Sequence, residues 1–151
     1  MIHITLVAVG KIKEKYFAAA LDEYTKRLSK YCRFEIVEVR EFNDKDRDAN
    51  VRLEAAEIAA KLKGHVMLCD IRGEEVSSER LAAKIEKLAL NNAAITFVVG
   101  GSHGVGAHLD GRVGEKISFG PVTLPHQLFR VILAEQIYRA FTILNNESYH
   151  K

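Results

Sequence analysis

Short apolar runs alternate with amphipathic stretches along most of this 151-residue chain, and this alternation constrains the fold more than any other feature. The runs predict buried strands over residues 2–9, 34–39, 65–71 and 94–99, because each is dominated by β-branched or other apolar side chains. Between these runs, apolar side chains recur at helical spacing. Strands that alternate with helices indicate an α/β fold with a mainly parallel sheet and helices on both faces.

Three amphipathic helices are expected between the four strands. The second follows a polar loop over residues 43–50, and the third begins at Ser77 or Ser78, either of which can cap it. The strand over residues 65–71 is expected to end in the turn Arg72-Gly73. The apolar stripes of the helices are Phe17, Leu21, Tyr24 and Leu28; Val51, Ala55, Ile58 and Leu62; and Leu81, Ile85 and Leu88.

The last third of the chain departs from this regular alternation. A short strand is expected over residues 117–119, then an irregular segment over residues 120–125, then a long helix to about Leu144. That helix has almost no polar face, so one side can cover its own sheet while another needs a second cover. A homodimer supplies that cover most economically.

Composition limits the class of protein. The 48% apolar content suits one core of ordinary size, so we expect a single domain over residues 1–151. Cys32 and Cys69 form no Cys-x-x-Cys pair, and the histidines lack paired helical spacing with a carboxylate, so neither a disulfide framework nor a metal site is expected. The N-terminus resembles a strand more than a secretory signal, and no apolar run reaches membrane-spanning length. We therefore expect a cytoplasmic protein.

The net charge of +2 does not by itself indicate nucleic-acid binding. Basic residues are nevertheless concentrated over residues 11–33, a stretch that contains seven basic and three acidic residues. Such a patch can contact phosphates without reading sequence, although a solvated helix face is the commoner fate of such charges. The seven basic residues are Lys11, Lys13, Lys15, Lys26, Arg27, Lys30 and Arg33.

A glycine cluster over residues 100–106 directly follows the fourth expected strand, where α/β sheets bind ligands. It lacks the Gly-Lys-Ser/Thr of a P-loop and the spacing of a dinucleotide fingerprint, and a simple tight turn is the alternative. Irregular backbone also follows Leu68 and Ser118. We expect the three segments after Leu68, Val99 and Ser118 to converge into one pocket shaped for a nucleoside.

Six motifs lie in order along essentially the whole chain. They are Leu6-Val7-Ala8-Val9-Gly10-Lys11, Val98-Val99-Gly100-Gly101-Ser102-His103-Gly104, Thr123-Leu124-Pro125-His126-Gln127, Arg130-Val131, Glu135-Gln136-Ile137-Tyr138-Arg139-Ala140 and Tyr149-His150-Lys151. Together they closely resemble the ribosomal RNA large-subunit methyltransferase H family, also called YbeA-like. The Leu-Pro-His, Tyr-Arg-Ala and terminal Tyr-His-basic signatures are far more specific than the glycine loop.

The resemblance implies a SPOUT-type α/β knot: a mainly parallel sheet with helices on both faces and a C-terminal trefoil knot, in a homodimer. It implies transfer of a methyl group from S-adenosyl-L-methionine to N3 of a pseudouridine in 23S ribosomal RNA. The modest basic patch, without a separate RNA-binding domain, suits a large and already folded substrate such as an assembled ribosome. Relatives often carry leucine where this chain has Cys69, which preserves an apolar contact, and His103 receives no catalytic role. By position, the cofactor contacts are Cys69, Gly100, Phe119, Gly120, Pro121, Val122, Thr123 and Leu124.

N3 of a pseudouridine is a poor nucleophile while it is protonated, so the reaction needs a proton acceptor or a nearby positive charge. The histidines of the last motifs suit the first role and the basic residues suit the second or a phosphate contact, while Tyr149 can stack on the base. The candidates are His126 and His150 for the proton, Arg130, Arg139 and Lys151 for the charge, and Tyr149 for stacking.

Two of these candidates have equally plain structural interpretations. Arg139 lies four residues after Glu135, the spacing of an ion pair on a helix surface. His126 follows Pro125 at a helix start, where it can satisfy free backbone groups. Two other protein classes also remain: an RNA-binding dimer without catalysis, and an α/β enzyme that binds another nucleotide at the glycine loop. Calorimetry with S-adenosylmethionine, ATP and NAD tests the second class, and methyl transfer to ribosomes that lack the modification tests the first.

Overall fold

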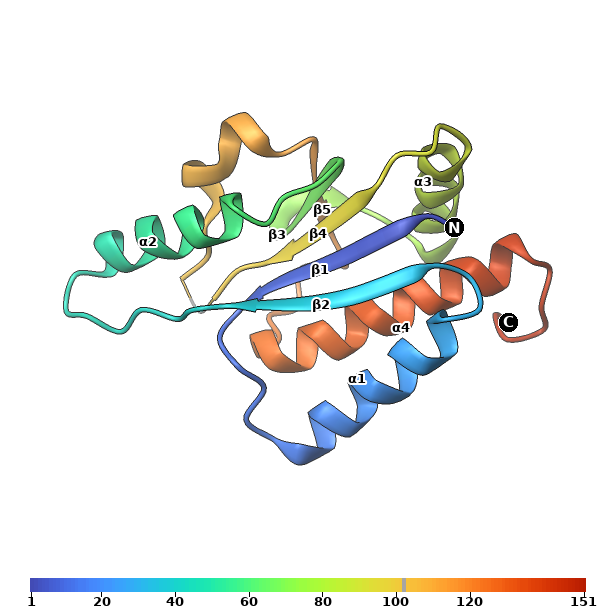
Figure 1. Cartoon of the computed structure of the whole chain (residues 1–151), viewed down its shortest axis with the longest axis horizontal. Coiled ribbons are helices and arrows are strands. Elements are labelled where there is room, and N and C mark those ends of the chain that lie inside the picture. Colours follow the sequence, from blue (N-terminus) through green and yellow to red (C-terminus); the bar gives the residue numbers. More distant parts are fainter. Residues whose placement is uncertain (102) are drawn as a thin grey trace.

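The sheet is entirely parallel. A computed structural model describes residues 1–101 and 103–151, and its five strands follow the order β2-β1-β4-β3-β5 (Figure 1). The expected α/β class with a parallel sheet is therefore confirmed. The strands are β1 (His3–Val9), β2 (Arg33–Val39), β3 (His65–Glu75), β4 (Ile95–Val99) and β5 (Glu115–Ser118).

Helices cover both faces of this sheet, as the alternation predicts. On one face lie α1 (Lys15–Leu28), α3 (Ser78–Leu90) and α4 (His126–Leu144), and on the other lie α2 (Arg47–Ala59) and the short 3-10 segment η1 (Gly106–Arg112) (Figure 1). Alternate side chains of each strand enter the two cores. On β1, Leu6 packs beneath α4 while Val7 packs toward α2.

The second helix begins earlier than the sequence suggests. The polar stretch predicts a loop over residues 43–50, yet α2 starts at Arg47. The side chain of Asp46 accepts a hydrogen bond from the amide of Ala49 at 3.2 Å and so caps the helix. This cap extends α2 by one turn and brings the side chain of Arg47 to the carboxyl ends of the strands.

The turn expected at Arg72-Gly73 is also wrong. Strand β3 continues to Glu75, and its pairing with β5 shifts register between Cys69 and Glu74. A Cβ atom on Gly73 would lie 2.7 Å from the amide nitrogen of Ile117, so glycine serves close strand approach here and not a turn. The irregularity turns residues 70–72 toward the same end of the sheet.

Helix α4 runs beneath the central strands. None of its 19 residues is fully exposed, and it packs between α1 and α3. Seven residues separate the end of β5, at the edge of the sheet, from the start of α4 beneath its central strands. This connection therefore crosses the carboxyl ends of the strands. Among the described residues, no helix has both the length and the apolar character needed to span a membrane.

Candidate active site

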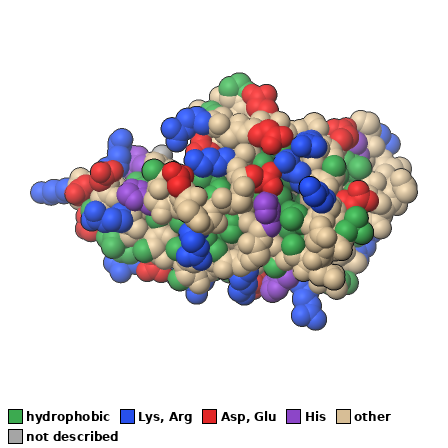
Figure 2. All heavy atoms as spheres, turned by 90° about the horizontal axis from the view of Figure 1, so that it is seen from above, with side chains coloured by type: hydrophobic (Ala, Val, Ile, Leu, Met, Phe, Trp, Pro, Cys, Tyr) green, Lys and Arg blue, Asp and Glu red, His purple; other side chains and the backbone are tan. Residues whose placement is uncertain are grey.

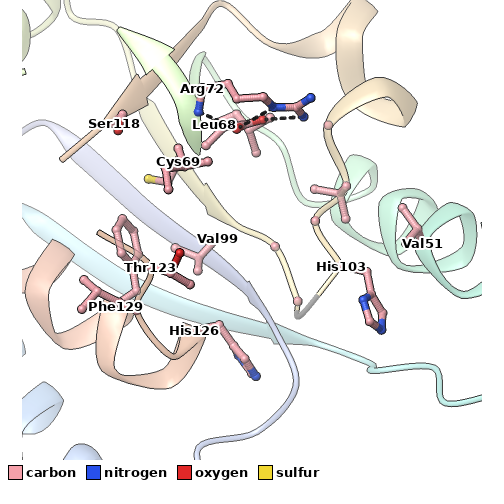
Figure 3. A pocket seen from close by; sticks show the side chains of 18 of the residues that line it. Val51, Leu68, Cys69, Arg72, Val99, His103, Ser118, Thr123, His126 and Phe129 are labelled. Carbon is pink, nitrogen blue, oxygen red and sulfur yellow. Dashed lines mark hydrogen bonds and ion pairs between the residues drawn. The ribbon is translucent and has the colours of Figure 1, made fainter. Parts of the chain in front are cut away.

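The three segments expected to converge do so. The carboxyl ends of β3, β4 and β5 lie at one edge of the parallel sheet, and the residues after Leu68, Val99 and Ser118 line one cavity of about 560 Å³ (Figure 3). This volume falls within the range of small-molecule sites, about 300 to 1,000 Å³. The sequence-based prediction of a single pocket at the strand ends is confirmed.

One wall of the cavity is apolar. Phe119 and Phe129 stack with ring centroids 5.5 Å apart, and Cys69 and Leu124 also line the cavity. Burial raises the pKa of the Cys69 thiol to about 12, so the side chain stays neutral. The Cys69 side chain therefore suits an apolar contact better than nucleophilic attack.

Backbone polar groups stand beside this apolar wall. Gly120 has a φ of +113°, which residues with side chains rarely adopt, and the Ser118 hydroxyl both accepts from its amide at 3.1 Å and donates to its carbonyl at 3.2 Å. Within residues 1–101 and 103–151, the amides of Val122, Thr123 and Leu124 have no hydrogen-bond partner. Unpartnered amides beside an apolar surface suit the polar edge and flat face of a nucleoside.

The structure brings nearly all predicted cofactor residues to this cavity. Cys69, Gly100, Phe119 and Gly120 line it, together with Val122, Thr123 and Leu124, whereas Pro121 does not. Ser102 of the glycine loop lies outside the described residues. The residues thus fit a nucleoside cofactor as a group, while each individual contact stays a prediction.

His126 is the predicted catalytic residue that lines the cavity. Its Nδ1 atom is buried and has no hydrogen-bond partner in the described part of the chain, and no side chain caps the start of α4. The interpretation that His126 satisfies backbone groups there is therefore not supported. Burial, followed by the charge of Arg130, lowers the pKa of His126 below its usual value, so the ring is neutral near pH 7 and can accept a proton.

Arg130 has a bracing role within this chain. It is fully buried, pairs with Glu38 at 2.9 Å, and donates to the carbonyls of Val9 and Gly10 at 2.6 and 2.8 Å. These bonds tie α4 to the carboxyl end of β1. Arg130 does not line the cavity, and a part in catalysis stays a prediction.

The other predicted catalytic residues form a second cluster at the far end of α4. Glu135 accepts hydrogen bonds from Arg139 at 2.7 Å and from the Tyr149 hydroxyl at 2.9 Å, so the expected ion pair between Glu135 and Arg139 is confirmed. The Arg139 guanidinium lies over the Tyr149 ring, 4.6 Å from its centroid. Burial and the bond to Glu135 raise the pKa of Tyr149 to about 12, so its hydroxyl stays protonated.

The chain terminus is held by further contacts. His150 accepts from Arg139 through Nδ1 at 3.1 Å and contacts Glu79 through Nε2 at 2.7 Å. Because a guanidinium can only donate, Nδ1 carries the lone pair and the ring proton lies on Nε2. The hydroxyl of Tyr31 also donates to Glu147. The end of the chain is therefore docked on α3, on α4 and on the turn that follows α1.

Within one chain, His126 at the cavity does not meet the second cluster at the other end of α4. Arg139 follows His126 by 13 residues on α4, which corresponds to about 20 Å along the helix axis. Candidates at both ends of α4 can serve one reaction only if a second copy of the chain brings its tail to the cavity.

Four basic or imidazole side chains that line the cavity had no role predicted from the sequence. Three of them come from parts of the chain that the sequence did not place at the cavity: the first turn of α2, the irregular part of β3, and η1. The fourth, His103, lies inside the glycine cluster, which was the only signal in the sequence for any of the four. These residues are Arg47, Arg72, His103 and His108. Among the described residues, no three His, Cys, Asp or Glu side chains are grouped as a metal site requires.

Comparison with known proteins defines the class. Residues 2–150 match the family described as "Predicted SPOUT methyltransferase", so the chain belongs to the SPOUT methyltransferases. Three relatives are each called "Ribosomal RNA large subunit methyltransferase H", with a "1" added to the first: those of Clostridium perfringens (strain SM101 / Type A), Limosilactobacillus fermentum and Clostridium botulinum (strain Hall). They are 44%, 46% and 43% identical, over 99% of both chains. Within its class, the chain is a member of the ribosomal RNA large subunit methyltransferase H family.

Proposed function

We propose that this protein transfers the methyl group of S-adenosylmethionine to N3 of a pseudouridine in 23S ribosomal RNA, acting on the assembled ribosome. The observation that carries the proposal is the cavity, in which backbone from three strand ends meets an apolar aromatic wall. Family membership and the names of the relatives support methylation of large-subunit ribosomal RNA. Action on ribosomes places the protein in the cytoplasm, and a single SPOUT domain suffices for it.

The cavity's first task is to bind and orient. The unpartnered amides of Val122, Thr123 and Leu124 would bind the adenine edge, while Phe119 and Cys69 would contact its faces. When bound, S-adenosylmethionine supplies an activated methyl group. Holding the target nitrogen in line with that group at close range removes much of the entropic barrier, so the protein can contribute largely by positioning.

The second task is to remove the N3 proton. His126 suits it better than His150, because both nitrogens of His150 are already engaged by Arg139 and Glu79. His126 lines the cavity and its lowered pKa keeps the ring neutral near pH 7; because its unpartnered Nδ1 is buried within the described structure, Nε2 is the nitrogen that would meet the substrate. We call the second cluster, Arg139, Tyr149 and His150, the tail cluster. Its Arg139 would supply the positive charge that stabilises the anionic base, and its Tyr149 would stack on the base.

This division of tasks requires a homodimer. The outward side of α4 carries partly exposed Leu128, Val131 and Ile132 next to Glu135 and Arg139. A second copy packed on that stripe would cover the apolar part and carry its tail cluster toward the first copy's cavity. Each cavity would then be completed by the partner's tail.

The C-terminal trefoil knot is part of the same proposal. Strand β5 lies at one edge of the sheet, whereas α4 starts beside β1, where Arg130 meets the carbonyls of Val9 and Gly10. The connection over residues 119–125 must therefore cross the ends of β3 and β4 beside the glycine loop. Such a crossing is the local geometry from which a knot is built.

The deciding experiment is mass spectrometry of ribosomal RNA from cells with and without the gene. We expect one pseudouridine of 23S RNA to lose a methyl group at N3 in the deletion strain, and purified protein with S-adenosylmethionine to restore it on ribosomes from that strain. Unchanged RNA in the deletion strain contradicts the proposal. Binding of S-adenosylmethionine without transfer would favour the non-catalytic RNA-binding dimer, and a preference for ATP or NAD would favour a different enzyme.

A further inference from the structure

The cavity has a second wall of different chemistry. Across from Thr123 and Phe129, Figure 3 shows His103 toward Val51 of α2, and Arg72 above Leu68 and Cys69. Arg47 at the start of α2 and His108 of η1 also line the cavity, and both belong to the elements that cover the same face of the sheet as Val51. We call the set Arg47, Arg72, His103 and His108 the basic wall. Its members come from four separate segments, and neither a tight turn nor the docking of a nucleoside explains them.

The charges on the basic wall are available for a ligand. Arg72 is tied to Asp70, whose carboxylate also accepts from the Arg72 amide at 2.9 Å, yet 82% of the Arg72 side chain is exposed. Within the described residues, Arg47 has no ion-pair or hydrogen-bond partner. Asp48 also lines the cavity, but it lies in the first turn of α2, where its charge complements the helix terminus.

We propose that the basic wall binds the RNA backbone, through the phosphates that flank the target nucleotide. This inference rests on the proposed function and adds the position of the RNA chain to it. Arginine and imidazole groups on an open rim can each contact a phosphate oxygen, which positions a strand without reading its sequence. The basic wall and the apolar wall thus divide the cavity: one side holds the cofactor, and the other guides the strand whose base enters between them.

The surface around the basic wall agrees with this assignment. Figure 2 shows Lys, Arg and His side chains gathered with acidic ones toward the end of the molecule where α2 lies. A mixed surface attracts RNA weakly overall, so local contacts at the rim must provide the register. Two charges of the basic stretch over residues 11–33 are already paired, because Arg27 pairs with Glu23 at 2.8 Å and Lys30 with Glu147 at 3.5 Å.

The carboxylate of S-adenosylmethionine is the competing anion, and one experiment separates the two. The double variant Arg47→Ala/Arg72→Ala is compared with the wild type and with Arg52→Ala, an exposed arginine of the same helix that does not line the cavity. Affinity for ribosomes from the deletion strain, whose large subunits lack the methyl group, is measured by fluorescence anisotropy across a range of KCl at constant Mg²⁺. Affinity for S-adenosylhomocysteine is measured by calorimetry.

We expect the double variant to bind these ribosomes about tenfold more weakly. The slope of log affinity against log salt should fall by about two, because each of the two arginines neutralises one phosphate. Affinity for S-adenosylhomocysteine should stay within about twofold, and Arg52→Ala should match the wild type. Arg47→Lys/Arg72→Lys should regain most of the RNA affinity, because it keeps the charge.

Two results overturn the inference. A decrease in S-adenosylhomocysteine affinity as large as the decrease in RNA affinity assigns the wall to the cofactor carboxylate. An unchanged salt slope removes phosphate binding altogether. If the wild type itself neither binds S-adenosylhomocysteine nor methylates the ribosomes, the proposed function fails instead, which is a different outcome from either of these.

Discussion

The two ends of α4 carry the same kinds of side chain in opposite states. At the first turn, His126 faces the cavity with a buried nitrogen that has no partner in the described structure. At the last turns, Arg139 and His150 are tied into a network with Glu135 and Glu79. The side chain at the first end lines a cavity that can hold a ligand, whereas the side chains at the second end are already paired with one another. This contrast supports the proposal that chemistry occurs at the first end and that the second end is presented to another copy of the chain.

Removal of residues 149–151 should have the largest effect. If the tail completes the partner's cavity, turnover should fall about 1,000-fold, because the variant lacks both a stacking group and the partner of Arg139. Affinity for S-adenosylhomocysteine should be unchanged, because the proposed cofactor contacts all come from the chain that forms the cavity and none from residues 149–151. Single-turnover methylation of ribosomes and calorimetry measure the two quantities.

Mixing variants sharpens this comparison. The tail deletion is unfolded and refolded together with Leu124→Asp, which places a charge in the apolar wall. In a statistical mixture, half of the dimers contain one copy of each variant, and one of their two sites is intact, so about a quarter of the wild-type activity should return. No recovery beyond the sum of the two variants would show that each tail serves its own chain.

Arg130→Met should cause the largest decrease in stability. It leaves Glu38 and the carbonyls of Val9 and Gly10 without their buried partner, so the free energy of unfolding should fall by about 3 kcal/mol. Arg27→Met is the matched control, because its ion pair with Glu23 is on the surface and should hardly move the denaturation midpoint. Equal midpoints for the two variants in urea titrations would contradict the bracing role of Arg130.

His126→Asn should lower turnover by about 100-fold while leaving S-adenosylhomocysteine affinity intact. The wild type should keep its activity as the pH falls through the ordinary histidine range near about 6.5, because burial lowers the pKa of His126 and the ring stays neutral. Below that range activity should decline, and the Asn variant should lack this decline. A pH profile of turnover that is unchanged in shape by the substitution would assign the proton to another group.

The lowered pKa of His126 also makes the stability of the folded chain depend on pH in a predictable direction. The unfolded chain protonates His126 at a higher pH than the folded chain does, since the folded-state pKa is the lower one. His126 therefore destabilises the folded state once the pH falls below the unfolded value, and contributes nothing above it. Melting temperatures of the wild type and His126→Asn should agree above about pH 7 and diverge in favour of the variant at lower pH.

The sequence predicted what depends on local pattern. The four main strands, the long C-terminal helix and the pocket at the strand ends followed from apolar periodicity and from the rule that parallel strands present their carboxyl ends together. It missed the extension of β3, because that depends on how closely Gly73 approaches β5. It missed η1 for a similar reason, since Leu109 packs beneath α2 only in the folded chain.

Side-chain partners across long sequence separations were beyond sequence reasoning. Nothing in the pattern around Arg130 indicates full burial, because its partners Val9 and Glu38 lie about ninety or more positions away in the chain. The spacing of Glu135 and Arg139 did predict their ion pair, since that contact is local to one helix. The docking of His150 on Glu79 depends on α3 and α4 lying side by side, which only the fold determines.

The smallest effect tests how rigid the second end of α4 must be. Glu79→Gln keeps the size of the side chain but removes the charge that faces Nε2 of His150, and the pKa of Glu79 is lowered chiefly by that contact. Because Glu79 is exposed, stability should hardly change, whereas turnover should fall about threefold as the tail samples other positions. Glu86→Gln, on an exposed part of α3, is the matched control. If both variants keep full turnover while the tail deletion does not, then the bonds of Glu135 to Arg139 and Tyr149 alone hold the tail in place.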